Sequence, residues 1–561
     1  MTDPTDPTDP TDPIFPCCEA DMLNTANSTI LDDAVDEAAR TARTARAGGR
    51  AISWSALLPW ALPVFVYLLW WKAAQAGWMS AQILPAPERV WETARDLLHD
   101  GLVSNLLISL ERLAIGFVLG TLGGALLGAL MGASVIAEET IAPLFYAIAQ
   151  VPPLALLPLL MVMLGIGEAL KIVLIFKAVA IPVAIHTQTG VRGMSWRLRE
   201  VAGVLRLGAW QRVRLLVVPA ALPAFLTGVR QALAQGWLTL IAVELLASSE
   251  GMGYLMVYGR QMFQLDVVFV CIVTIGLTGF AIDQGVQCID RWLVRWPHEA
   301  PGARVATSAR GGQRYARGAV LPAAILALWA VAAHLHWVDA NLLPAPRAVL
   351  HGALDDLRSG ALPVALAQTL ARAGEGLLAG AVAGLTLGIA LGAVPWVRRA
   401  FGPTLTALRQ VAIFAWIPLL TAWAGLGDLA KVIFVALAAF FPVVLATSRA
   451  VEGLPPALVE VALTLRLNAW QRLRWLIVPA ILPGVFAGLR LALVYAWLGA
   501  IGAEYLMPSG VGLGTFMMDA QQLFRTDRLL AAAVTIGALG ALFGWLGSRL
   551  EASATRWRTR H

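Results

Sequence analysis

The chain contains one charged, amphipathic passage twice, at residues 192–237 and 452–497. The first copy reads EVAGVLRLGAWQRVRLLVVPAALPAFLTGVRQALAQGW from Glu200, and the second reads EVALTLRLNAWQRLRWLIVPAILPGVFAGLRLALVYAW from Glu460. The same offset of 260 residues relates further pairs: Gln150/Gln410, Lys171/Lys431, Pro182/Pro442 and Trp210/Trp470. A charged segment repeated between apolar runs predicts a membrane protein built from two equivalent halves. We expect the repeated segment to carry the mechanism.

Composition agrees with a membrane location. Apolar residues make up 58% of the chain and charged residues 14%, and the mean hydropathy is +0.70. Apolar runs near 20 residues recur, enough to cross a hydrocarbon core of about 30 Å. The excess positive charge comes from arginine, which in a membrane protein indicates orientation rather than nucleic-acid binding. The four cysteines show no spacing typical of metal ligands or of a disulfide framework.

We predict an all-α polytopic protein with two parallel repeats of about six transmembrane helices each, and both termini in the cytoplasm. The predicted domains are a disordered tail at 1–52, repeat 1 at 53–296, a cytoplasmic linker at 297–318, repeat 2 at 319–555 and a basic tail at 556–561. The predicted spans are 55–77, 104–132, 140–164, 169–190, 218–247 and 266–290, then 319–338, 364–394, 401–424, 429–449, 478–506 and 528–549.

The orientation follows from span number and arginine distribution. Six spans in each half return the chain to its starting side, so the repeats should be parallel rather than inverted. Arginines gather at 192–214 and 291–317 and are scarce at 247–265. Positive residues favour the cytoplasmic side, so both copies of the repeated segment are expected there.

The second span of each half carries a glycine at every fourth position. Small residues at this spacing let helix backbones approach closely in lipid. Tight helix packing is one interpretation, and a sliding surface used in gating is the other. The two ladders are Gly116, Gly120, Gly124, Gly128 and Gly132, and then Gly376, Gly380, Gly384, Gly388 and Gly392.

The repeated segment is predicted to form a helix, a break and a second helix. Gly208 or Asn468 interrupts the pattern, and Pro219 or Pro479 marks the start of the next span, where a missing N–H is harmless. Such a hairpin has two possible partners for its apolar residues. It could lie on the lipid interface or dock on a cytosolic protein.

These residues resemble the EAA loop of type I ABC importer permeases. The Glu–x–Ala motif is followed by an apolar–Pro pair 18 and 19 residues after the Glu. The surrounding motifs QVPPLALLPLLMVMLGIG, SSEGMGYLMVYGRQMFQLD and SGVGLGTFMMDAQQLFRTD also fit this family. Together they resemble the nitrate/sulfonate/taurine/bicarbonate permease family over residues 55–555, in tandem-fused form.

The resemblance implies a bacterial inner-membrane location and several partners. These are two copies of a cytoplasmic ATP-binding subunit, which would bring ATP and Mg, and a periplasmic or extracellular solute-binding protein. It implies that each EAA-type loop docks into a groove on one ATPase subunit. The expected ATPase-coupling residues are Glu200, Ala202, Arg206, Gly208, Trp210, Glu460, Ala462, Arg466, Asn468 and Trp470.

Two departures from the family pattern carry structural expectations. The family glycine six residues after the Glu is Arg206 and Arg466 here, with a break two residues later. In the third span of the second half, IFAWIPLL replaces the proline-rich PPLALLPLL. We therefore expect less kinking at 412–415 than at Pro152–Pro153.

Polar residues inside predicted spans are candidates for the translocation pathway. An arginine well inside a membrane costs about 2.5–3.5 kcal/mol unless it finds a partner, so the two span arginines either pair with neighbouring groups or ease passage of an anion. Leu437 occupies the place of Lys177 in the second half, so the electrostatic field along the pathway would differ between the two halves. The candidates are Gln150, Lys177, Arg230, Trp237, Glu244, Gln410, Arg490, Trp497 and Glu504.

The sequence predicts a translocation subunit without enzymatic activity of its own. No lysine follows a glycine as a P-loop requires, so no ATP site, catalytic residue, metal or cofactor is expected on this chain. The expected cargo is a small anion of the sulfonate, taurine, nitrate or bicarbonate class. Two alternatives stay open: a secondary transporter of two-halved, twelve-helix type, and an ABC importer for a non-anionic molecule such as a pyrimidine precursor.

Overall fold

The computed structural model describes residues 54–194, 196–293, 311–339 and 342–554. The predicted N-terminal tail, most of the predicted linker and the basic C-terminal tail lie outside these residues.

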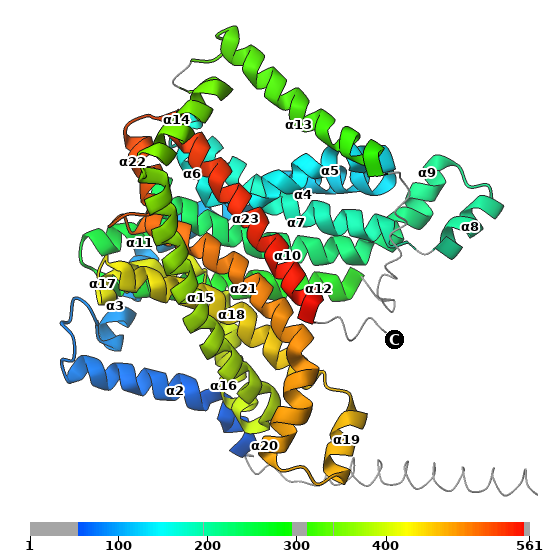
Figure 1. Cartoon of the computed structure of the whole chain (residues 1–561). Coiled ribbons are helices and arrows are strands. Elements are labelled where there is room, and N and C mark those ends of the chain that lie inside the picture. Colours follow the sequence, from blue (N-terminus) through cyan, green and yellow to red (C-terminus); the bar gives the residue numbers. More distant parts are fainter. Residues whose placement is uncertain (1–53, 195, 294–310, 340–341, 555–561) are drawn as a thin grey trace, which may run out of the picture. The chain divides into compact units, whose positions relative to one another are not determined.

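The first half is a run of helices with short connections (Figure 1). Its elements are α2 (Trp54–Gln75), α3 (Pro87–His99), α4 (Leu102–Ala133), α5 (Val135–Gln150), α6 (Pro153–Leu164), α7 (Glu168–Arg192), α8 (Trp196–Val204), α9 (Ala209–Arg212), η1 (Val213–Val217), α10 (Val218–Ala247), α11 (Met252–Gln261) and α12 (Leu265–Leu293).

The second half repeats this order, which confirms two parallel all-α repeats. Its elements are α13 (Gly311–His334), α14 (Pro346–Arg358), α15 (Ala361–Ala393), α16 (Pro395–Gln410), η2 (Ile413–Trp416), α17 (Ile417–Ala424), α18 (Asp428–Glu452), α19 (Pro456–Thr464), α20 (Ala469–Gln471), η3 (Arg472–Ile477), α21 (Val478–Leu506), α22 (Leu513–Gln522) and α23 (Thr526–Ala554).

The helices fall where the spans are predicted. Nine helices among the described residues are long and apolar enough to cross a membrane, and the number rises to eleven if each of two bent pairs counts as one span. The bent pairs are α5 with α6, and α16 with η2 and α17. The first predicted span corresponds to α2, which is not among those candidates.

The glycine ladders lie in tight helix–helix contacts. Helix α4 packs along α7, and α15 packs along α18 (Figure 1). A Cβ added at any of the ten ladder glycines would lie closer than 3.0 Å to an atom of the facing helix. For Gly124 and Gly128 that nearest atom is a backbone carbonyl oxygen. The predicted close packing is therefore confirmed, because the backbones touch where side chains are missing.

The expectation of a straighter third span in the second half is wrong. Helices α5 and α6 meet at 92°, and α16 meets the η2–α17 pair at 94°. The backbone is extended at Val151 in the first half and at Val411 in the second. The second break therefore forms without the two consecutive prolines of the first.

The breaks are explained by contacts between the halves. Val411 lies against Gly276 of α12, and the carbonyl oxygen of Gln410 lies over Gly279. The same contact occurs in reverse, where Val151 lies against Gly537 and the Gln150 carbonyl over Gly540 of α23. Each third span thus turns where it meets two glycines on the sixth span of the other half.

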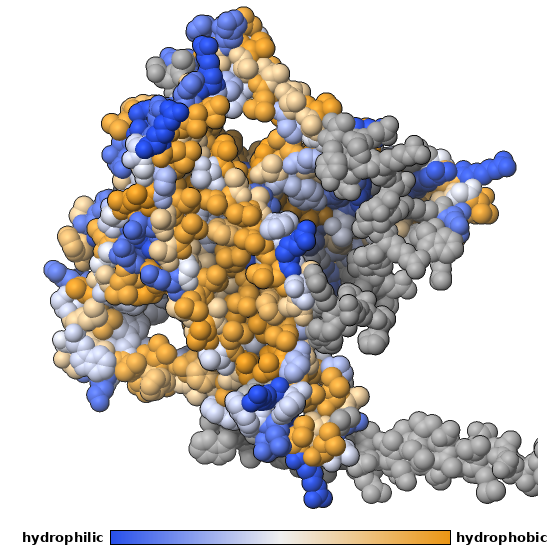
Figure 2. Space-filling model, viewed as in Figure 1, coloured by the Kyte–Doolittle hydropathy of each residue, from blue (hydrophilic) through white to orange (hydrophobic). Residues whose placement is uncertain are grey.

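The outer surface of the helices is apolar. Figure 2 shows apolar residues covering the region where Figure 1 places α15, α21 and α23. Large exposed side chains there include Leu378, Leu491 and Val534. An exposed apolar surface of this extent on spanning helices is typical of contact with lipid.

Candidate functional site

Each half carries a helical hairpin between its fourth and fifth spans. In the first half, Leu207 donates its backbone N–H to the carbonyl oxygen of Ala202 at 3.1 Å, and this bond closes α8. Arg206 lies inside the closing turn with φ of 47°, a left-handed conformation usually held by glycine. In the second half Leu467 bonds Ala462 at 3.1 Å, and Arg466 has φ of 49°.

The predicted break lies at 205–208 in the first half and at 465–468 in the second, because α8 ends at Val204 and α19 at Thr464. Within it, Arg206 and Arg466 adopt the left-handed turn at the position where the family pattern has glycine. Gly208 and Asn468 are the last residues before the next short helix. The Gln211 side chain accepts a hydrogen bond from the Gly208 N–H at 3.0 Å.

The second hairpin has an additional cap. The Gln471 side chain accepts from the Asn468 N–H at 3.0 Å, and the Asn468 side chain accepts from the Gln471 N–H at 2.7 Å. This reciprocal pair is a capping box. Gly208 has no side chain to complete the same box, so the two hairpins are not equivalent.

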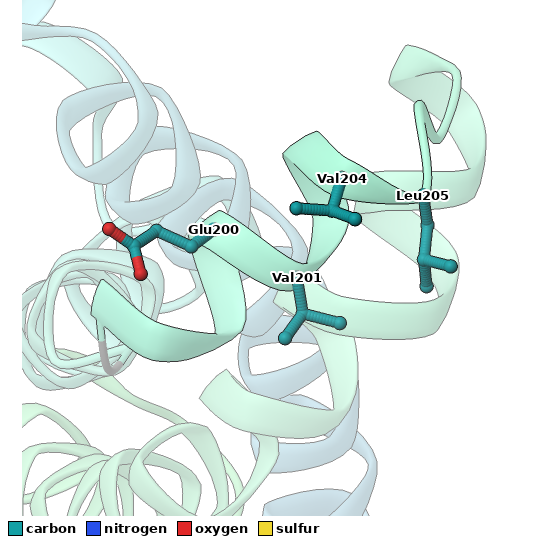
Figure 3. Close-up of a pocket in the computed structure, with 4 residues that line it drawn as sticks. All are labelled: Glu200, Val201, Val204 and Leu205. Atoms are coloured by element: carbon teal, nitrogen blue, oxygen red, sulfur yellow. The ribbon is translucent and has the colours of Figure 1, made fainter.

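The hairpins expose apolar side chains. Glu200, Val201, Val204 and Leu205 line a shallow hollow on α8 and its following turn (Figure 3). Figure 3 shows the Glu200 carboxylate directed away from Val204 and Leu205. Val204 is 83% exposed and Trp210 is 73% exposed, and Trp470 in the second hairpin is 65% exposed.

Each hairpin is joined to the fifth span without a gap in the helix. The π-helical segments η1 and η3 lead directly into α10 and α21, and continuous helices run over Trp210–Ala247 and Arg474–Leu506. A π-helical turn is a local irregularity often found at functional sites. Movement of a hairpin would therefore be transmitted to the span that carries the candidate pathway residues.

A polar junction surrounds the break in the second half. Arg230 of α10 donates two hydrogen bonds to the Asp283 carboxylate of α12, at 3.0 and 3.3 Å. Gln410 at the end of α16 also donates to Asp283, at 3.1 Å. Trp237 lies beside the same stretch of α12, because its indole nitrogen and the Gln410 carbonyl both border Gly279. The sixth span of one half and the broken span of the other thus share one carboxylate.

The junction around the first break has a different chemistry. Gly544 occupies the position on α23 that Asp283 holds on α12, and Gln150 lies beside it. Arg490 pairs instead with Glu551 farther along α23, at 3.2 Å. Lys177 donates to the Val151 carbonyl at 2.5 Å, an interaction that Leu437 cannot make.

A second polar cluster lies at the opposite ends of the spans. Glu244 accepts hydrogen bonds from Ser109 at 2.8 Å, from Arg112 at 2.9 Å and from the Gly253 N–H at 3.1 Å. Arg112 also binds Glu168 at 2.7 Å. Glu244 is 1% exposed, so its charge is balanced inside the protein rather than by water.

The second half repeats this cluster around Glu504, which is fully buried. Thr369 donates to it at 2.9 Å, Arg372 at 2.6 Å and the Gly514 N–H at 3.0 Å. Arg372 also pairs with Asp428 at 2.9 Å. Sequence reasoning missed the two arginines as partners, although the offset of 260 between Arg112 and Arg372 would have revealed them.

The structure divides the predicted pathway residues into three groups. Arg230, Trp237 and Gln410 meet at one junction, and Gln150, Arg490 and Trp497 border the other, with Lys177 bound to the first break. Glu244 and Glu504 lie apart from these, in the enclosed clusters. The predicted coupling residues lie together in the two hairpins.

The comparison with known protein families matches each half of the chain separately. Residues 120–295 and 378–556 each match the family described as binding-protein-dependent transport system inner membrane component. The chain belongs to this family. Because the family matches twice, the chain is a tandem-fused permease of the type I ABC importer class, a multi-pass protein of the bacterial inner membrane.

Three relatives from this family each match less than half of this chain, and the match covers most of each relative. The putative aliphatic sulfonates transport permease of Bacillus subtilis is 36% identical over 271 residues, covering 47% of this chain and 98% of that protein. The taurine transport permease of Escherichia coli is 32% identical over 237 residues, covering 41% and 86%. The riboflavin transport permease of Chloroflexus aurantiacus is 32% identical over 261 residues, covering 46% and 97%.

Proposed function

We propose that this chain forms the whole translocation unit of an ATP-driven importer. Two separate ATPase subunits would bind, one at the α8–α9 hairpin and one at the α19–α20 hairpin, and would supply ATP and Mg. A solute-binding protein would deliver cargo at the opposite ends of the spans. Both termini would then be cytoplasmic, on the hairpin side.

The observation that carries this proposal is the pair of exposed, apolar hairpins whose second helices continue through η1 and η3 into the fifth spans. Trp210 and Trp470 occupy equivalent places and are largely exposed, and such aromatic residues commonly anchor protein interfaces. Membership of the ABC permease family argues for docking on an ATPase rather than lying on lipid. It also sets aside the secondary-transporter alternative.

We propose a small sulfonate as the cargo class. Two of the three relatives described above are named for aliphatic sulfonates or taurine. The riboflavin permease keeps a non-anionic cargo as a second candidate. Binding of ethanesulfonate, taurine and riboflavin to the partner solute-binding protein, measured by calorimetry, separates these cargo classes.

The docking proposal is tested by removing the tryptophans. We expect Trp210→Ala to leave one ATPase subunit bound per chain, Trp470→Ala to do the same, and the double variant to bind none. Stoichiometry is measured by light scattering of the purified complex. Trp91→Ala is the matched control, because Trp91 is 68% exposed on α3, away from the hairpins.

Glu200 and Glu460 provide a separate test of coupling. We expect the double variant Glu200→Gln/Glu460→Gln to loosen assembly or to hydrolyse ATP without import. Full import with normal ATPase recruitment in that variant would contradict the proposed role of these carboxylates.

A further inference from the structure

A cleft lies between the end of α13 and the start of α14, where the two helices converge (Figure 1). The volume of this α13–α14 cleft is about 420 Å³, within the range of about 300–1,000 Å³ that small-molecule sites occupy. Ala330 and Ala333 form an apolar side, and His334, His336 and Arg347 supply polar groups. Among the residues that the structure describes, these three side chains have no hydrogen-bonded or ion-paired partner. Their N–H donors are therefore free to bind a ligand.

The first half builds the same frame around the corresponding place. Trp70 donates its indole N–H to the Pro85 carbonyl at 2.9 Å, and Trp329 donates to the Pro344 carbonyl at 3.0 Å. These bonds hold the end of α2 to the start of α3, and the end of α13 to the start of α14, in the same way. Positions in the two frames can therefore be compared one by one.

The first half closes this frame with its own side chains. Trp71 stands at the position of Ala330, and Glu88 at the position of Arg347. The Trp71 indole N–H donates to the Glu88 carboxylate at 2.8 Å. In the second half the large ring is replaced by a methyl group and the carboxylate by a guanidinium group. The second frame is therefore open and basic where the first is filled and acidic.

The backbone at His336 also distinguishes the two frames. His336 has φ of 53°, and Gly77 at the same position has φ of 65°. In each half the N–H of the next residue, Trp78 or Trp337, closes the helix with a hydrogen bond of 3.1 Å. A residue with a Cβ seldom adopts this conformation, and such residues cluster at functional sites. The second half thus holds a histidine, directed to the cleft, in a turn that glycine forms without strain.

The cleft lies at the ends of the spans opposite the hairpins. Helix α13 is long and apolar enough to cross a membrane between Arg317 and His334. Arg317 pairs with Glu139 of α5 at 2.9 Å. The adjacent Glu138 pairs with Arg192, the last residue of α7 before the α8–α9 hairpin. The start of α13 is therefore on the hairpin side, and its other end carries the cleft.

The cleft is bordered by helix faces that are suited to lipid. Leu326 is largely exposed and precedes Ala330 by four residues, so both lie on one face of α13. Leu350 is also largely exposed and follows Pro346, which lines the cleft, by four residues on α14. Trp337 is exposed beside them, and tryptophan is enriched where a membrane meets water. A free phosphate ion would not require these apolar borders, whereas a phospholipid would.

We propose that the α13–α14 cleft binds the phosphate group of an anionic phospholipid. The Arg347 guanidinium fork matches two phosphate oxygens, and His334 and His336 can each donate a ring N–H to the headgroup. Basic pockets beside spanning helices are typical headgroup sites. The acyl chains would lie along the exposed leucines of α13 and α14. The site belongs to the second half alone and does not depend on the cargo or on the ATPase.

Binding is measured by native mass spectrometry of the full-length chain in a neutral detergent, with dioctanoyl phosphatidylglycerol as the probe. The variant Ala330→Trp/Arg347→Glu introduces the pair that closes the first half. We expect it, and the milder Arg347→Gln, to bind the lipid at least about tenfold more weakly than the native chain, because a charge-assisted hydrogen bond is lost. Arg358→Gln is the matched control, since it removes a cation from the other end of α14. It should bind as the native chain does.

Equal binding by the native chain and both cleft variants overturns the site, and so does an equal loss in the Arg358→Gln control. The source of the phosphate is tested in the same titration. We expect dioctanoyl phosphatidylglycerol to bind at least about tenfold more tightly than inorganic phosphate or dioctanoyl phosphatidylcholine. Inorganic phosphate that displaces the lipid at equal concentration would assign the cleft to a free oxyanion and overturn the lipid assignment. Phosphatidylcholine that binds equally well would contradict the role of the basic groups.

Discussion

Two glycines on α15 allow the helix-packing argument to be tested within one helix. A Cβ at Gly376 would lie 2.5 Å from Cβ of Val435 and 3.1 Å from the backbone nitrogen of Ala436. A Cβ at Gly374 would meet nothing within 4 Å. The variants Gly376→Ala and Gly374→Ala therefore change the same chemistry two residues apart, one against α18 and the other in open space.

The expected free-energy difference follows from these contacts. Both variants gain about 0.8–1.0 kcal/mol of helix propensity. At Gly376 the new methyl group needs roughly 1 Å more room, because carbon atoms in contact lie about 3.5–4.0 Å apart. Val435 Cβ is fixed to its backbone, so the helix pair must separate, and such overpacking costs about 1–3 kcal/mol. We expect Gly376→Ala to be less stable than Gly374→Ala by about 1–3 kcal/mol.

The assay is unfolding of the purified chain by sodium dodecyl sulfate in mixed micelles, followed by circular dichroism. Free energies of unfolding that agree within about 0.5 kcal/mol, the usual range for surface changes, would refute the close-packing argument. Import by the assembled transporter tests the sliding-surface interpretation. A Gly376→Ala chain of undiminished stability that no longer imports cargo would favour sliding over static packing.

Two other substitutions test the buried charges and the hairpin turn. Arg112→Met leaves Glu244 buried without its cation and should lower the free energy of unfolding by about 3–5 kcal/mol. The control Arg89→Met removes an exposed arginine from its pair with Asp266, which keeps its hydrogen bond from Thr93, and should change the free energy by less than about 1 kcal/mol. Similar losses in the same mixed-micelle titration would contradict the cluster. Arg206→Gly removes the backbone strain of a left-handed arginine, about 1–2 kcal/mol. We therefore expect slower proteolysis within the hairpin. Faster cleavage would show that the arginine side chain itself stabilises the turn.

The sequence predicts features that depend on local composition. The sequence predicts twelve spans because crossing lipid demands about 20 apolar residues in a row. Among the described residues, nine to eleven of them correspond to helices long and apolar enough to cross a membrane, and those helices begin and end close to the predicted limits. The glycine ladders likewise depend on a spacing that a single helix displays. Both signals are contained within one stretch of chain.

Features that depend on distant contacts could not be predicted in the same way. The break after Gln410 forms where α16 meets Gly276 and Gly279 of the other half, and no proline pair marks it. The Glu244 cluster joins residues more than 130 positions apart. Residue propensities do not predict the left-handed conformation of Arg206, since arginine rarely adopts it.

The crossed contact between the halves has a consequence for how such a chain can evolve. In a symmetric pair of separate subunits, every substitution appears on both sides of the axis at once. Here Asp283 meets Gln410, while Gly544 meets Gln150, so each side of the interface is encoded separately. Joining the copies also guarantees that unlike halves are paired in every molecule. In a duplicated gene of this kind, substitutions can change the junction on one side of the pathway while the junction on the other side is kept.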